Sequence, residues 1–362
     1  MRQHSIAAIP GDGIGGEVIA AGLEVLTAVE NADGGFHLTV ETFSWGSDYY
    51  RAHGRMMAED GLDALRPFDA IYFGAVGDPD VPDHVSLWGL RLAICQGFDQ
   101  YANIRPARLL PGIAGPLAGV TTTDIDWIIV RENSEGEYAG ARRRVHRDLA
   151  EEVGLDVSVF TRTGVERIMR HAFDLARERP RRRLTMVTKS NAQRHGMVMW
   201  DDIFAVVRGD YTDVEADRML VDAMAARMVL DPASIDVAVA SNLHADILSD
   251  LAAALSGSMG IAPTANLDPS RRAPSMFEPI HGAAFDIAGA GVANPIGAFW
   301  TAVMMLDHLS EETAAVRLMT AIEHVTGSGR ALPRDLGGTA STAEVTAAVI
   351  GALAGVNAGV ND

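Results

Sequence analysis

Three aspartates of this 362-residue chain are spaced in a way that suits a divalent cation. Asp246 and Asp250 in "SNLHADILSDL" are four residues apart, so both carboxylates lie on one face of a predicted helix that begins just after Asn242. Asp222 in "MLVDAMAARMV" lies in an otherwise apolar helical stretch, where a buried carboxylate needs a partner. Mg²⁺ and Mn²⁺ prefer carboxylate oxygens, so all three are candidate metal ligands. A solvated acidic helix face is the alternative for Asp246 and Asp250.

Lys189 is the second candidate for chemistry. Of the 30 lysine and arginine residues it is the one lysine. An amine that is removed from water can release its proton near neutral pH, whereas a guanidinium cannot. Lys189 is therefore a candidate general base, and the alternative is chance in a chain that favours arginine.

The glycines of "IAAIPGDGIGGEVI" raise the question of a dinucleotide fingerprint. Gly11, Gly13 and Gly16 have the spacing G-x-G-x-x-G after a short apolar run. In a Rossmann unit an acidic residue about 20 positions later binds the ribose. The candidates here, Glu30 and Asp33, precede the next strand-like run, "FHLTVETF", and do not end it. The match is weak, and a plain turn from strand to helix explains the glycines equally well.

The elements that must position these residues form an α/β pattern. Short β-branched runs such as "DAIYFGAVG", "IDWIIVREN", "LTMVTKSN" and "IDVAVASN" alternate with helical patterns, which is typical of a largely parallel sheet. Ligand sites in such sheets lie beyond the carboxyl ends of the strands. Five polar residues are predicted at those ends: Arg131, Asn133, Lys189, Asn191 and Asn242.

Composition excludes several classes of partner. The net charge of −18 argues against nucleic acid or an anionic membrane surface. The longest apolar runs are too short to span a bilayer, and no charged-then-apolar leader opens the sequence, so we expect a cytoplasmic protein with no membrane partner. Cys95 is the one cysteine, so an intrachain disulfide is impossible and any metal must have oxygen or imidazole ligands.

A series of motifs along almost the whole chain resembles one enzyme family. They run, in order, from "IPGDGIGGEV", "AVGDPDVPDHVSLWG", "FDQYANIRP", "VRENSEGEY" and "SVFTRTGVERI" to "TKSN", "VDAM", "SNLHADILSDL", "FEPIHGAAFDIAGAGVANPIGAFW" and "RDLGGTAST". They are similar to the NAD-dependent β-decarboxylating hydroxyacid dehydrogenases, the isocitrate/isopropylmalate dehydrogenase family. "VPDHVSLWG" and "FDQY" resemble its tartrate and D-malate branch most.

The resemblance implies a two-domain α/β fold with a largely parallel sheet that is not a Rossmann fold. The larger, cofactor-side domain is expected from residues 1–100 with 256–362. The smaller domain, residues 101–255, is expected to carry the dimer interface and the catalytic tyrosine and lysine. The glycine-rich opening is then a strand-to-helix loop beside the nicotinamide end of the cofactor.

The same resemblance implies a mechanism. Arg105 and Arg131 bind a substrate carboxylate, because a guanidinium fork matches a carboxylate bidentately. Asp246 and Asp250 of one subunit, with Asp222 of its partner, hold Mg²⁺ or Mn²⁺. Lys189, also from the partner, takes the hydroxyl proton as hydride leaves for NAD⁺. The oxidised product loses CO₂, and Tyr138 then protonates C3. The active enzyme is therefore expected to be a homodimer with shared sites.

The cofactor residues also follow from the resemblance. The expected contacts are Ile14, Glu278, His281, Gly282, Asp286 and Asn294. Asp286 stands where an acid accepts hydrogen bonds from a ribose diol and repels a 2′-phosphate, so NAD is expected over NADP. K⁺ is a further cation that the resemblance admits.

One departure from the family pattern concerns the substrate. In "GLRLAICQGFDQY" Cys95 stands where the family has an arginine for the distal part of the substrate, and Arg91 lies one helical turn earlier. We therefore predict that Arg91 and Cys95 line the distal pocket and that Arg91 supplies part of the missing clamp. Tartrate or D-malate is the expected substrate. A 3-isopropylmalate or other 3-substituted malate, and a non-catalytic paralogue subunit, are the alternatives.

Overall fold

The computed structural model describes residues 1–356 and divides them into two compact units. Unit 1 comprises residues 1–100 and 108–122 together with the chain from 253 onward, and unit 2 comprises 101–107 and 123–252. The expected ranges differ from these units in two places. The segment 108–122 belongs to unit 1, and the second crossing comes at 253, three residues earlier than expected.

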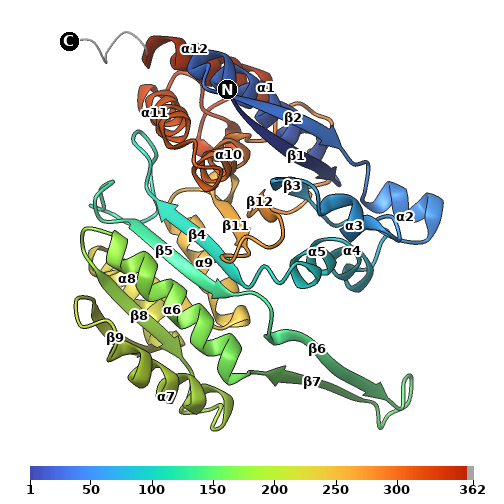
Figure 1. Ribbon diagram of the computed structural model, residues 1–362, viewed down its shortest axis with the longest axis vertical. Coiled ribbons are helices and arrows are strands. Elements are labelled where there is room, and N and C mark those ends of the chain that lie inside the picture. Colours follow the sequence, from blue (N-terminus) through green and yellow to red (C-terminus); the bar gives the residue numbers. More distant parts are fainter. Residues whose placement is uncertain (357–362) are drawn as a thin grey trace. The chain divides into compact units, whose positions relative to one another are not determined.

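Unit 1 contains five strands in the order β2-β1-β3-β12-β11 (Figure 1). β1 is parallel to β2 and β3, β12 is parallel to β3, and β11 is antiparallel to β12. The strands are β1 Arg2–Gly11, β2 Phe36–Thr42, β3 Ala70–Ala75, β11 Pro263–Leu267 and β12 Ser275–Pro279. The predicted run "DAIYFGAVG" thus forms β3, and all six of its residues are buried.

Helices cover the sheet of unit 1, and α10 lies at the centre of this packing because it contacts β3, β11, β12, α1 and α11. No helix within residues 1–356 is long and apolar enough to cross a membrane. The helices are α1 Gly15–Asp33, α2 Ser47–His53, α3 Gly61–Leu65, α4 Asp83–Gly89, α5 Arg91–Gly97, α10 Ile296–His308, α11 Glu312–Ser328 and α12 Thr342–Val356.

Unit 2 contains five more strands in the order β4-β5-β10-β8-β9, and the pairs of β10 with β5 and β8 and of β8 with β9 are parallel. Its strands are β4 Ala102–Arg108, β5 Asp126–Glu132, β8 Arg183–Thr188, β9 Glu215–Leu220 and β10 Val237–Ala240. Its helices are α6 Arg162–Glu178, α7 Gly196–Arg208, α8 Val221–Leu230 and α9 Asn242–Leu255. The largely parallel α/β fold is confirmed.

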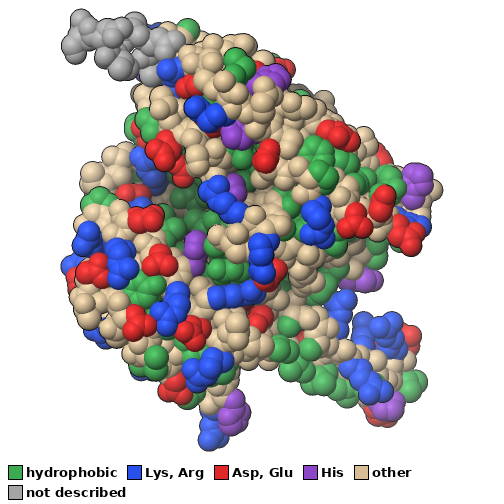
Figure 2. All heavy atoms as spheres, in the orientation of Figure 1, with side chains coloured by type: hydrophobic (Ala, Val, Ile, Leu, Met, Phe, Trp, Pro, Cys, Tyr) green, Lys and Arg blue, Asp and Glu red, His purple; other side chains and the backbone are tan. Residues whose placement is uncertain are grey.

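A separate antiparallel ribbon in unit 2 consists of β6 Gly136–Val145 and β7 Val153–Val159. Every residue of β7 is exposed, including valines and a leucine. Arginines 142 to 144 are exposed on β6, and Figure 2 shows basic side chains gathered along this ribbon.

The opening glycine-rich segment connects β1 to α1. Gly11 has φ +71°, and a Cβ placed on it would lie 1.9 Å from the Ala75 carbonyl oxygen of neighbouring β3. Gly13 has φ +54°, and its Cβ would lie 2.0 Å from the Ala283 carbonyl oxygen. Both positions therefore require glycine for conformation and for space. The glycines fix this loop against β3 and the segment after β12.

A cluster of charges in unit 1 joins the start of the chain to the residue directly before α11. Glu311, buried just before α11, accepts hydrogen bonds from Arg2 Nε and Nη2 at 2.6 Å each, and its Oε1 lies 2.7 Å from His4 Nε2. These contacts bind the start of β1 to a residue 309 positions later.

His308 at the end of α10 makes the stability of unit 1 depend on pH. Its ring lies 5.3 Å from that of Phe277, and burial, with a smaller effect of the Arg271 charge, lowers its pKa to about 4. The unfolded chain therefore binds a proton at His308 between pH 6.5 and 4 that the folded chain does not, so stability falls as the pH falls through this window.

We expect the free energy of unfolding of the wild type to drop, between pH 8 and pH 5, by about 2 kcal/mol more than that of His308→Phe. Urea denaturation at the two pH values measures this difference. His324→Gln, a change at an exposed histidine of α11, is the control and should follow the wild type. Parallel pH dependence of wild type and His308→Phe would contradict the prediction.

Candidate active site

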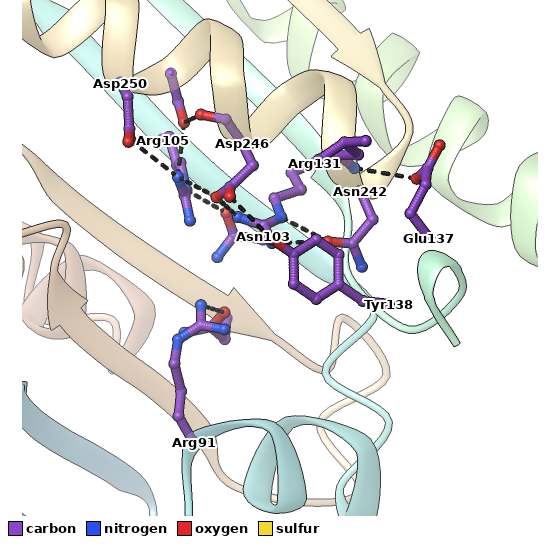
Figure 3. A network of polar contacts seen from close by, with 12 residues as sticks. Arg91, Asn103, Arg105, Arg131, Glu137, Tyr138, Asn242, Asp246 and Asp250 are labelled. Atoms are coloured by element: carbon purple, nitrogen blue, oxygen red, sulfur yellow. Dashed lines mark hydrogen bonds and ion pairs between the residues drawn. The ribbon is translucent and has the colours of Figure 1, made fainter. Parts of the chain in front are cut away.

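Arg105 on β4 is the first residue of a polar cluster in unit 2 (Figure 3). It is 6% exposed; its Nε donates to Asn103 Oδ1 at 2.8 Å, and its Nη1 donates to Ser249 Oγ at 2.6 Å. The same Nη1 lies 3.2 Å from Asp246 Oδ1 and 3.8 Å from Asp250 Oδ1. The guanidinium is thereby fixed against the predicted metal-binding face of α9.

Arg131 at the end of β5 reaches the same carboxylate. It is 3% exposed, and it donates from Nε and Nη2 to Asn242 Oδ1 at 2.9 and 2.7 Å. Its Nη1 donates to Asp246 Oδ1. Tyr138 of β6 donates from Oη to Asp246 Oδ2 at 3.2 Å, and the Arg131 guanidinium carbon lies 5.3 Å from the centre of its ring. Figure 3 shows these side chains converging on Asp246.

Asp250 lies one turn further along α9. Burial raises the pKa of its carboxyl, and the neighbouring Asp246 charge adds to the rise, while Arg105 and Arg131 oppose it. A site with two stacked carboxylates and two fixed guanidinium groups can bind a cation at the acids and a carboxylate at the arginines. The structure thus brings together five of the predicted residues from four different elements.

Lys189 and Asp222 form a second group in unit 2. Lys189 follows β8, and its Nζ donates to Asp222 Oδ1 at 2.5 Å, in the first turn of α8. The hydrogen bond from Lys189 is the main cause that lowers the pKa of Asp222. The expectation that Asp222 is buried is wrong for the single chain, because its side chain is 65% exposed on the solvent side of α8. The predicted base and the predicted third ligand are direct neighbours.

The positions of these side chains show whether their carboxylates suit a divalent metal ion. Within residues 1–356 of one chain, no three histidine, cysteine, aspartate or glutamate side chains gather where they could hold an ion. Asp246 and Asp250 supply two carboxylates of the type that Mg²⁺ and Mn²⁺ prefer. Burial is the main cause of the raised pKa of Asp250, and the repulsion from Asp246 that adds to it is one that a cation would offset. The two acids fit the metal, and the third predicted ligand, Asp222, is not part of this group.

A pocket of about 240 Å³ in unit 1 contains half of the predicted cofactor residues. Ile14, His281 and Asn294 line it, together with Ser258 and Asp335. His281 Nε2 is buried without a hydrogen-bond partner among the described residues, and burial is the main cause that lowers the pKa of this histidine. A neutral imidazole with an unused nitrogen is ready to bond a ligand, so the pocket fits part of a dinucleotide.

The other three predicted cofactor residues lie outside the lining of this pocket. Gly282 and Asp286 are exposed in the segment that follows His281, and space around a Cβ at Gly282 is open. Glu278 is 5% exposed on β12 and is bonded elsewhere in unit 1. The structure therefore gives Glu278 a different partner from the expected cofactor.

That partner is Arg91, the residue predicted to clamp the substrate. Arg91 Nη2 lies 2.7 Å from Glu278 Oε1, its Nε donates to the same oxygen at 2.8 Å, and Nη2 also donates to Asn266 Oδ1 at 3.2 Å. Asn266 Nδ2 donates to Glu278 Oε1 at 2.7 Å. The predicted role of Arg91 in substrate binding stays a prediction, and its observed role is in a buried ion pair.

We expect Arg91→Ala to destabilise the protein by about 3 kcal/mol, because it leaves the Glu278 carboxylate buried and uncompensated. The double replacement Arg91→Met and Glu278→Met removes both charges and should recover most of this loss. Urea denaturation of the wild type and the two variants gives the comparison. If Arg91→Ala keeps wild-type stability and raises KM for the best substrate, the clamp is the correct role.

Cys95 lies in an apolar environment in unit 1. It is 1% exposed, on the face of α5 that packs into a core with Leu65, Ile71, Phe98 and Met276. A small, weakly polar thiol is suited to such a place. Its proposed place in a substrate pocket stays a prediction, and the burial of its side chain argues against it.

Two residues that position Arg105 escaped sequence reasoning. Asn103 lies two residues before Arg105 on β4, and Ser249 lies three residues after Asp246 on α9. Both spacings place a residue on the same face as a predicted site residue, by the two-residue period of a strand and the helical turn. That shared face is the signal that could have found them.

Comparison with known proteins gives the family. The isocitrate/isopropylmalate dehydrogenase family model matches residues 5–349. The chain is 66% identical over 349 residues, 96% of this chain and 97% of the other, to a probable tartrate dehydrogenase/decarboxylase of Agrobacterium vitis. It is 49% identical over 356 residues, 96% and 98% of the two chains, to the decarboxylating D-malate dehydrogenase of Escherichia coli.

The isocitrate dehydrogenase of Methylococcus capsulatus has a similar structure, with a TM-score of 0.87 at 34% identity over 97% of this chain and 99% of that one. The protein belongs to the isocitrate/isopropylmalate dehydrogenase family. The predicted family, its fold class and the likeness to the tartrate and D-malate branch are confirmed.

Proposed function

We propose that this protein oxidises a 2-hydroxy diacid of the tartrate or D-malate type with NAD⁺ and removes the β-carboxylate as CO₂ where the substrate allows. The observation that carries the proposal is the convergence of two buried arginines and a tyrosine on Asp246, beside Asp250. The names of the relatives agree with this substrate class.

Arg105 and Arg131 bind a carboxylate of the substrate. Their guanidinium groups are held by Asn103, Ser249 and Asn242, so the donors are fixed before the substrate arrives. Bidentate binding of a carboxylate uses this fixed geometry, and little side-chain entropy is lost when it forms. The two arginines thereby orient the C2 hydrogen and hydroxyl for reaction.

Asp246 and Asp250 are the residues of this chain that hold Mg²⁺ or Mn²⁺. When bound, the metal supplies a positive charge that polarises the C2 oxygen and stabilises the charge that develops as CO₂ leaves. Asp222 completes the ligand set from the partner subunit of a homodimer. This assignment explains why no three acidic, histidine or cysteine side chains gather to hold an ion within residues 1–356 of one chain.

Lys189 and Tyr138 transfer the protons. With NAD⁺ bound as the hydride acceptor, Lys189 in its neutral amine form would accept the hydroxyl proton at Nζ, directly or through water, as C2 becomes a ketone. The bond between C3 and the β-carboxylate then breaks, and its electron pair forms the C2–C3 double bond of an enolate as CO₂ leaves. Tyr138 Oη donates a proton to C3, and the C2 ketone forms again. Lys189 acts in the site of the partner subunit, in the same way as its neighbour Asp222.

Ile14, His281 and Asn294 bind NAD together with the exposed segment that carries Gly282 and Asp286. When bound, NAD⁺ supplies the hydride acceptor. The unused Nε2 of His281 supports this assignment, because His281 lines the pocket and this buried nitrogen has no hydrogen-bond partner among the described residues.

We expect kcat/KM with NAD⁺ to exceed that with NADP⁺ by about tenfold or more, roughly 1.4 kcal/mol, because the Asp286 carboxylate repels a 2′-phosphate. Steady-state kinetics with the two cofactors measure the preference. Asp286→Ser should narrow it, whereas Glu312→Gln, a change at an acid elsewhere in unit 1, should not. Equal kcat/KM for both cofactors in the wild type would refute the role of Asp286.

The function as a whole is tested by incubating 2-hydroxy diacids with NAD⁺ and Mn²⁺ and following NADH. Tartrate and D-malate should give NADH, and 3-isopropylmalate is the comparison that defines the distal specificity. If the folded protein forms no NADH with any of these diacids, the proposal is overturned and a non-catalytic subunit is favoured.

A further inference from the structure

We propose that unit 1 carries a second ligand site, for a small phosphate-bearing anion, in a pocket at the amino ends of β1, β3 and β12. The pocket has a volume of about 280 Å³, and its lining includes His4, Asp69 and Pro274, which lie near or directly before the starts of the three strands. The residues proposed for NAD follow the carboxyl ends of β1 and β12, so the two sites lie at opposite edges of the same sheet.

Three arginines line this pocket. Arg271 and Arg272 form no ion pair with any residue in the described chain, although Arg272 Nε donates to Ser270 Oγ at 2.7 Å. Arg66 has one loose ion pair, 3.8 Å to the exposed Asp63. The chain has a net charge of −18, yet the positive charges of these three arginines are hardly balanced by nearby carboxylates. This arrangement favours the binding of an anion.

The acidic groups nearby are already engaged. Asp69 lines the pocket, but its Oδ2 accepts hydrogen bonds from Ser5 N at 2.7 Å and Ser5 Oγ at 2.9 Å. Glu311 is occupied by Arg2 and His4. His308 also lines the pocket, and because its pKa is lowered to about 4 its ring is neutral at pH 7. Three arginines against the one Asp69 carboxylate therefore leave the lining positively charged.

The loop that presents Arg271 and Arg272 is held rigidly. Asp268 accepts hydrogen bonds from the backbone N–H groups of Ser270, Arg272 and Ala273 at 3.0, 2.9 and 3.2 Å. Arg271 has φ +54°, an unfavourable conformation for a residue with a side chain, and this network keeps it there. Both guanidinium groups start from a fixed backbone, which lowers the entropy lost when an anion binds.

The chemistry of the lining selects the ligand class. Guanidinium groups bind phosphate oxygens bidentately. Three guanidinium groups favour a ligand that carries more than one negative charge. The volume is near the lower end of the range for small-molecule pockets, about 300–1,000 Å³, which suits a diphosphate or a small phosphate ester. Both ligands share the phosphate that the arginines bind.

Calorimetric titration of the full-length protein with inorganic pyrophosphate tests the site. The titration contains saturating NAD⁺, so that the cofactor pocket is filled, and sodium chloride of matched ionic strength is the blank. We expect one pyrophosphate bound per chain and a Kd raised at least about tenfold in the double variant Arg271→Gln, Arg272→Gln. Arg66→Gln, on a different segment, should raise Kd in the same direction.

Arg330→Gln, at an exposed arginine that lines a different pocket of unit 1, is the matched control and should keep the wild-type Kd. Glycerol 3-phosphate in place of pyrophosphate distinguishes the source of the phosphate, because tighter binding than inorganic phosphate indicates an ester. No heat beyond the chloride blank, or an unchanged Kd in both pocket variants, would overturn the proposal. Neither result depends on turnover, so the proposed function is tested separately.

Discussion

Chelation of divalent metal with EDTA is expected to abolish turnover, and Mn²⁺ or Mg²⁺ in excess to restore it. The reason is that no arginine or tyrosine of the site can replace a divalent charge next to the C2 oxygen. Asp246→Asn should weaken the affinity for the metal by about an order of magnitude or more, because it removes a charged oxygen ligand.

Titration of activity against free Mn²⁺ gives this affinity. Asp48→Asn, at a fully exposed acid of α2, is the control for a general effect of lost charge and should leave the titration unchanged. Full activity in the presence of the chelator would end the metal proposal. It would leave Asp246 as a residue that only positions Arg105 and Arg131.

Lys189→Arg is expected to lower kcat by about 10²–10⁴-fold, the usual contribution of a general acid or base. Arginine keeps the positive charge and can still donate a hydrogen bond to Asp222, but it does not release a proton near neutral pH. The variant therefore separates proton transfer from charge, and the metal titration should change little.

Rapid-mixing kinetics with NAD⁺ and the best diacid measure the loss directly. Arg208→Lys, at the exposed end of α7, is the control. It replaces an arginine by a lysine away from the site, and kcat should stay unchanged. A near-normal rate in Lys189→Arg would show that Lys189 only holds Asp222 in place.

The strands that position the site could be predicted because they are buried on both faces. The runs "IDWIIVREN", "LTMVTKSN" and "IDVAVASN" form β5, β8 and β10. Arg131, Lys189 and Asn242 lie at or just after the carboxyl ends of these strands, as predicted. A continuous apolar run that ends in polar residues is a strong signal for such a strand. Asp246 and Asp250 followed from helical spacing alone.

The features that the sequence did not predict depend on contacts between distant parts of the chain, or on side chains that are exposed in the folded structure. The partner of Arg91 is Glu278, 187 residues away, and no local pattern indicates that pair. β7 has no buried face in the single chain, so it lacks the alternation that identifies a half-buried strand. Asp222 was predicted to be buried because its neighbours are apolar, but its side chain on α8 faces solvent.

Unit 1 is built from both ends of the chain, and this has a consequence for biosynthesis. β3 pairs with β12, and the start of β1 is bound by Glu311, so residues 1–100 cannot complete their sheet until about 200 more residues have been translated. At ~5–20 residues per second, that delay is about 10–40 s. During this interval unit 2 can fold, while the apolar strands β1 and β3 wait for β12 on the ribosome. We therefore expect the nascent N-terminal segment to keep the apolar strands β1 and β3 incompletely paired throughout this interval.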